Sequence, residues 1–132
     1  MKTIISIIIL CVILVMPVNA KNLVGSKWIY KVSTSCIDTI KFKSNNKLDY
    51  YSCESDCTIK GSYHLKNNII TLIEKDDSHD EDNGKATFYR LKFKLYGDCL
   101  YPINNEELVN GKWEKISENL IENTVFHRIH NR

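Results

Sequence analysis

The sequence lacks an excess of charge of either sign. It contains 18 lysines and arginines against 16 aspartates and glutamates. Proteins that bind nucleic acids or anionic membranes usually carry a strong positive excess, which attracts phosphate groups. The balance of charge therefore gives no indication of a nucleic acid or a membrane surface as partner.

Motifs for catalysis and for metal binding are also missing. The chain has no Gly-x-Ser-x-Gly elbow, no His-Glu-x-x-His pair and no glycine-rich phosphate loop. The acidic segment EKDDSHDEDNGK does not follow the spacing of an EF-hand loop. Cys53 and Cys57 have three residues between them, whereas zinc ligands usually have two. We therefore expect a protein that is not an enzyme, with no catalytic residue, no cofactor and no metal.

A long apolar run occurs only at the N-terminus. Lys2 precedes the apolar residues 4–16, and a small residue, Ala20, stands where a signal peptidase would cut. The run is short for a membrane-spanning helix, which needs about 20 apolar residues. We interpret residues 1–20 as a signal peptide, with an uncleaved anchor as the alternative, and residues 21–132 as one secreted or periplasmic domain. Once the signal is cleaved, we expect no association with the membrane.

The cysteines occur in a pattern typical of an exported domain. One of the five cysteines, Cys11, leaves with the predicted signal. An even number in a short exported chain favours two disulfides, for which three pairings are possible. The alternatives are a zinc site and four buried thiols. The remaining cysteines are Cys36, Cys53, Cys57 and Cys99.

The mature chain shows a hydrophobic period of two rather than 3.6. The alternation is clearest in KWIYKVS, TIKFK and TFYRLKFKLY, and polar turns such as SNNK separate the runs. About eight short strands follow, with turn residues every eight to twelve positions and no convincing long helix. The predicted fold class is all-β, a small antiparallel up-and-down β-barrel of about eight strands.

The sequence does not decide the local structure at Gly61 and in one later segment. Gly61 interrupts an alternating run, which indicates a bulge or a bend of the kind that a closing barrel needs. The segment NNEELVNGKWEKISENLIEN fits either a hairpin that turns at Asn110-Gly111 or a short helix. The final segment TVFHRIH fits a last strand.

Seven aromatic residues fall on the inward face of the predicted strands. Aromatic side chains with a few hydroxyl groups are typical of a concave site for a small apolar ligand. In a domain this small the same residues could also simply fill the core. The predicted ligand-binding residues are Trp28, Tyr30, Phe42, Tyr50, Tyr63, Tyr89 and Phe93.

The first half of the mature chain resembles the small lipocalin-like domains of exported bacterial proteins. The resemblance rests on LVGSKW, on TIKF with the following SNNKLDYY, and on KGSYHLKNNIITLIE. In LVGSKW two residues separate the glycine from the tryptophan, where lipocalins usually have one.

The resemblance also implies particular contacts. It implies that Arg128 stacks on Trp28 at the floor of the barrel. It further implies that Cys36 pairs with Cys53 or Cys57, with Cys57 preferred, and that the cysteine left over meets Cys99.

Two functions agree with these features of the chain. The first is a non-enzymatic lipocalin-like binding protein that holds a small apolar molecule inside the barrel. The second is a protein-binding barrel, such as an enzyme inhibitor or an immunity-type protein, that acts through the loops EKDDSHDEDNG and NNEELVNG. Lysine and arginine rows on the outer faces fit either protection against edge pairing or a basic strip for an acidic protein. These rows contain Lys41, Lys43, Arg90, Lys92 and Lys94.

Overall fold

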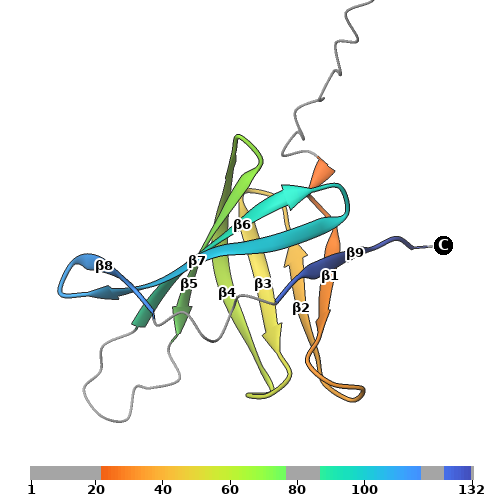
Figure 1. Cartoon of the computed structure of the whole chain (residues 1–132), viewed down its shortest axis with the longest axis horizontal. Coiled ribbons are helices and arrows are strands. Elements are labelled where there is room, and N and C mark those ends of the chain that lie inside the picture. The colour runs from red at the N-terminus through yellow and green to blue at the C-terminus, as the bar shows by residue number, and fades with distance from the viewer. Residues whose placement is uncertain (1–21, 77–86, 117–123, 132) are drawn as a thin grey trace, which may run out of the picture.

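The computed structural model describes residues 22–76, 87–116 and 124–131 (Figure 1). The predicted signal peptide and most of the acidic segment EKDDSHDEDNGK lie outside these residues. The described residues form nine strands: β1 (Lys27–Lys31), β2 (Ile37–Phe42), β3 (Lys47–Ser52), β4 (Cys57–Lys66), β5 (Ile69–Asp76), β6 (Thr87–Tyr96), β7 (Cys99–Val109), β8 (Lys112–Lys115) and β9 (Phe126–Ile129). Within these ranges, no helix is long and apolar enough to cross a membrane.

Eight of the strands close into an antiparallel barrel. Consecutive strands pair from β1 to β7, and β9 completes the ring between β7 and β1. The remaining strand, β8, pairs with the second half of β7, and this hairpin projects from the barrel in Figure 1. The predicted all-β, up-and-down barrel is therefore confirmed, with β8 as an additional strand. The ambiguous segment that starts at residue 104 begins as a hairpin rather than as a helix.

Asparagine residues form several of the tight turns between strands. Asn45 and Asn46, Asn67 and Asn68, and Asn110 with Gly111 all have positive φ angles, between 50° and 76°. A two-residue turn with positive φ at both positions matches the right-handed twist of the strands that it joins. Asparagine and glycine tolerate this backbone better than other residues do, which explains why the hairpins turn at these positions.

The barrel interior is lined by the inward faces of the alternating strands. Sequence alternation places every second side chain inside, because the side-chain period of a strand is two. One bulge interrupts the ladder: Lys92 pairs with Asn104 and Phe93 pairs with Pro102, which leaves Ile103 as the extra residue on β7. The buried apolar residues are Leu23, Trp28, Ile40, Phe42, Leu48, Tyr63, Ile70, Leu72, Phe93, Leu95, Leu100 and Phe126.

Gly61 does not form the bulge that its position in the sequence indicates. It pairs in regular register with Leu48 on one side and Glu74 on the other. A Cβ atom at this position would lie 2.5 Å from the backbone oxygen of Ile73. The glycine is therefore required by a close approach of two strands.

The structure corrects the expected disulfide pattern. Cys36 is bonded to Cys53, with 5.4 Å between the Cα atoms, and Cys57 and Cys99 are free. The preferred Cys36–Cys57 pairing is wrong because Cys57 lies on β4, opposite Ser52 and one strand further from Cys36. A bond from Cys57 to Cys99 is also not formed. Both residues begin a strand, and β4 and β7 run in opposite directions, so the two thiols lie at opposite ends of the barrel.

Candidate functional site

One end of the barrel is closed by residues that precede and flank β1. Leu23 is 1% exposed and Trp28 is fully buried. The indole Nε1 of Trp28 donates to Ser26 Oγ at 2.8 Å, and that hydroxyl donates to the Leu23 carbonyl. The guanidinium of Arg128 lies 5.9 Å from the centre of the Trp28 ring, and it also donates to the carbonyl of Asn22 at 3.0 Å. The predicted contact between Arg128 and Trp28 is confirmed, and we call this end the floor.

The seven predicted ligand-binding residues fall into two groups. Trp28, Phe42, Tyr63 and Phe93 belong to the buried core, with exposed fractions of 4% or less. Tyr30 and Tyr50 are only partly buried and pack against that core. Tyr89 is also half-buried, and its neighbours in the ladder are Glu74 and Glu107. The last three are thus the ones that a ligand could reach without displacing the buried core.

One aromatic residue that joins these groups was not predicted from the sequence. Phe126 on β9 is 1% exposed. Its ring centre lies 5.9 Å from that of Tyr30, 6.1 Å from that of Tyr50 and 5.8 Å from that of Phe93. These distances fit the tilted and edge-to-face arrangements that aromatic pairs prefer. The alternation in TVFHRIH places Phe126 on the same face as Arg128, and this pattern is the sequence signal that could have identified Phe126 as an inward residue.

Polar groups lie among the aromatic residues. Asp38 and Glu74 are 9% and 5% exposed. The hydroxyl of Tyr50 donates to Asp38 Oδ2 at 3.0 Å, and the backbone N–H of Cys53 donates to Asp38 Oδ1 at 2.9 Å. Burial raises the pKa of the Tyr50 phenol far above its ordinary value, and the charges of Asp38 and Glu74 raise it further. The phenol therefore remains a hydrogen-bond donor at all physiological pH values.

This raised pKa predicts a loss of stability in alkali. Above about pH 10 the unfolded chain releases the Tyr50 proton while the folded chain keeps it. The unfolded state then binds fewer protons, so the free energy of unfolding falls by about 1.4 kcal/mol per pH unit from this group. We expect the free energy of unfolding, measured with urea, to fall less steeply between pH 10 and about 11.5 in the Tyr50→Phe variant than in the parent protein.

A Cys57→Ser/Cys99→Ser background prevents thiolate attack on the disulfide during this measurement. Tyr51→Phe is the control on the outer face: Tyr51 is also half-buried, but its hydroxyl donates to Asp56, and this hydrogen bond is the main cause of its raised pKa. An equal alkaline slope in the Tyr50→Phe variant and the parent would contradict the assignment.

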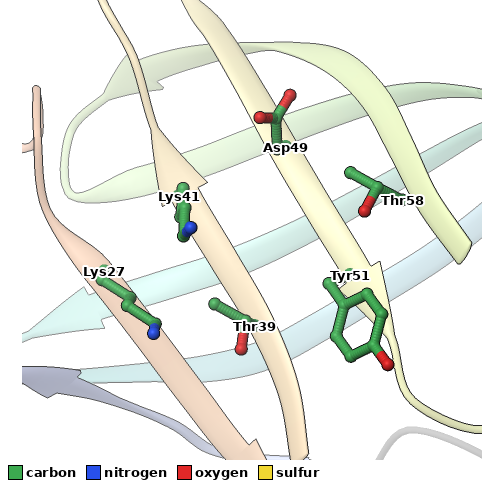
Figure 2. A pocket seen from close by; sticks show the side chains of 6 residues that line it. All are labelled: Lys27, Thr39, Lys41, Asp49, Tyr51 and Thr58. Atoms are coloured by element: carbon green, nitrogen blue, oxygen red, sulfur yellow. The ribbon is translucent and has the colours of Figure 1, made fainter. Parts of the chain in front are cut away.

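Two hollows are found among the described residues. The first, which we call the outer groove, has a volume of about 350 Å³ and crosses the outer face of β1 to β4 (Figure 2). Its lining residues are Lys27, Thr39, Lys41, Asp49, Tyr51 and Thr58. The second has a volume of about 450 Å³ and lies beside the junction of β1 and β9, where it is lined by Ile29, Tyr30, Lys31, Val125 and His127.

Comparison with protein-family models, with curated proteins and with solved structures found no significant match.

Proposed function

We propose that the protein is an exported, non-enzymatic, lipocalin-like binding protein that holds one small, mainly apolar molecule inside the barrel. The observation that carries the proposal is the difference between the two ends of the interior. Trp28, Arg128 and Leu23 seal the floor, whereas Tyr30 and Tyr50 remain partly exposed. An eight-stranded barrel has room for its own side chains or for one small ligand. A ligand would therefore enter from the end opposite the floor and contact the two tyrosines.

The buried carboxyl groups indicate which ligands are favoured. Asp38 and Glu74 both act electrostatically on the Tyr50 phenol. A ligand that carries a carboxylate into this region would be repelled, and a neutral molecule would not. We therefore expect retinol, an apolar molecule with a single hydroxyl group, to bind more tightly than a fatty acid of similar length.

Retinol fluorescence tests this function. We expect saturable binding at one molecule per chain and competition by other neutral apolar molecules. Tyr30→Glu should weaken binding at least tenfold, because it adds a carboxylate to the inner face. Ile29→Glu is the matched control, since Ile29 is the adjacent residue on the same strand, is equally half-buried and faces outward.

Circular dichroism establishes that both variants are folded before they are compared. In case Tyr30→Glu does not fold, amide chemical shifts of the unaltered protein provide a second measurement. Retinol should shift the resonances of Tyr30, Tyr50 and Phe126. Failure of retinol and other neutral probes to bind, or shifts confined to the outer face, would disprove the proposal.

One observation favours the second function, a barrel that binds a protein. Trp113 on the projecting β7–β8 hairpin is only half-buried, and the Arg90 guanidinium lies 4.5 Å from the centre of its ring. Arg90 also pairs with Glu106 at 2.5 Å, which lowers the pKa of that carboxyl. Tryptophan and arginine are enriched in the central residues of protein interfaces. If the native material contains a stoichiometric protein that Trp113→Ala releases, and no small ligand, this second function is the correct one.

A further inference from the structure

We propose that the outer groove binds a sugar that carries an anionic group, such as a sulfate or a carboxylate. This site is separate from the proposed interior site, because it lies on the other face of the same strands. Tyr50 faces the core while its neighbour Tyr51 lines the groove. Figure 2 shows the six lining side chains, which come from four adjacent strands.

The first reason is an unusual pair of lysines. Lys27 on β1 and Lys41 on β2 are direct partners in the antiparallel ladder. Like charges at directly opposite positions destabilise a sheet. Asp49 on β3 is the ladder partner of Lys41 on its other side, but Asp49 forms its ion pair with Lys43, and among the described residues neither Lys27 nor Lys41 forms an ion pair. Two adjacent positive charges that lack a partner at the edge of a hollow are suited to an anion that contacts both.

The second reason is the chemistry of the remaining lining. Thr39 and Thr58 provide hydroxyl groups, which can both donate and accept hydrogen bonds, and Asp49 provides acceptor oxygens. Asp49 forms its ion pair with Lys43, so an anionic ligand finds only two unpaired cations in the lining and no extended basic surface. A sugar with one anionic group can place that group near the lysines and direct its own hydroxyl groups toward Asp49. The mixture of charges therefore favours a sugar over a simple polyanion.

The third reason is the shape of the groove. Its volume of about 350 Å³ lies at the lower end of the range for small-molecule sites, which is roughly 300–1,000 Å³. The hydroxyl of Tyr51 donates to Asp56 Oδ1 at 2.9 Å, which ties the aromatic ring to the β3–β4 turn. A fixed aromatic ring gives the apolar face of a sugar a surface on which to pack.

A titration followed by amide chemical shifts tests the site with four probes. These are N-acetylglucosamine 6-sulfate, unsulfated N-acetylglucosamine, inorganic sulfate and a short polyglutamate peptide. We expect the sulfated sugar to bind at least tenfold more tightly than any other probe. The shifted resonances should belong to the residues that line the outer groove. Retinol should neither compete nor shift these resonances, so this result is independent of the interior site.

Substitution of one lysine gives a second, more specific test. Lys27→Gln should weaken binding of the sulfated sugar about tenfold, because one charge-assisted contact is lost. The same substitution should raise the midpoint of thermal unfolding by about 1–4 °C, because it removes the charge repulsion between residue 27 and its ladder partner Lys41. A variant that gains stability while it loses binding is expected only if the lysine pair serves a ligand.

Lys94→Gln is the matched control. Lys94 is an exposed lysine on β6, faces Ile69 and Tyr101 rather than another lysine, and lies outside the groove. It should change neither the affinity nor the thermal midpoint. Binding of inorganic sulfate as tight as that of the sulfated sugar would overturn the proposal, and so would tighter binding of polyglutamate. Equal loss of affinity in Lys27→Gln and Lys94→Gln would overturn it too.

Discussion

Replacing Phe126 with alanine should destabilise the protein far more than any substitution on the outer face of the barrel. Truncation of a fully buried phenylalanine usually costs about 3–5 kcal/mol. Phe126 is 1% exposed and its ring contacts Tyr30, Tyr50 and Phe93. Because a small domain has only about 5–15 kcal/mol of net stability, a loss of this size brings the folded state close to its limit.

The position of Phe126 adds a second effect. It lies on β9, which closes the barrel and pairs with β7 at only two positions, Cys99–His127 and Leu100–Phe126. Loss of the ring should therefore weaken the closure as well as the core. We expect faster hydrogen exchange at the backbone amides of β9 and at Lys27 and Ile29 of β1.

Urea unfolding measures the change in stability, and two variants calibrate it. Phe126→Leu keeps most of the buried volume and should cost much less than the alanine variant. Ile129→Ala is the control on the same strand, because Ile129 is 37% exposed. If Phe126→Ala and Ile129→Ala lose the same stability, Phe126 does not have the central role that its contacts indicate.

The fold could be predicted from the sequence because the patterns that define it, the alternation within strands and the turn residues, are local. Alternation in segments such as KWIYK and TFYRLKFKLY defines inner and outer faces without knowledge of the partner strands. Asparagine pairs at positions 45–46 and 67–68 mark turns whose backbone most other residues avoid. Both signals survive in a single sequence, so the class and the approximate number of strands follow from it.

Features that depend on register could not be predicted in the same way. Lys27 faces Lys41 because of the register in which β1 pairs with β2. Phe126 reaches Tyr50 because β9 closes the barrel. In a barrel the strands tilt, so residues distant in sequence and in the ladder can meet in the interior. The outer groove is built from four strands and could be recognised only once their register was known.

The prediction of the disulfide pairing was wrong for a related reason. Cys53 and Cys57 are close in sequence, and nothing local shows which of them lies beside Cys36. The β3–β4 turn decides the matter: Cys53 follows the last residue of β3, whereas Cys57 begins β4. Strand direction then separates Cys57 from Cys99.

Removal of the Cys36–Cys53 disulfide should give the second large loss of stability. The two cysteines are 17 residues apart, and a crosslink over a loop of this length stabilises a protein by about 3 kcal/mol through the unfolded chain. The bond also holds the backbone N–H of Cys53 against Asp38, which in turn accepts from Tyr50. We therefore expect a Cys36→Ala/Cys53→Ala variant to lose at least this amount in urea unfolding, with additional exposure of Tyr50.

The free cysteines provide the matched comparison for this prediction. Cys57 and Cys99 are half-buried and unbonded, so Cys57→Ala/Cys99→Ala changes the same number of side chains without opening a loop. That variant should lose less than half as much stability as the disulfide variant. Peptide mapping of the native protein should find one bridge, Cys36–Cys53, and two reactive thiols. A bridge from Cys57 to Cys36 or Cys53 would contradict the pairing, and a Cys57–Cys99 bridge would also require the barrel to open, since these two thiols lie at its opposite ends.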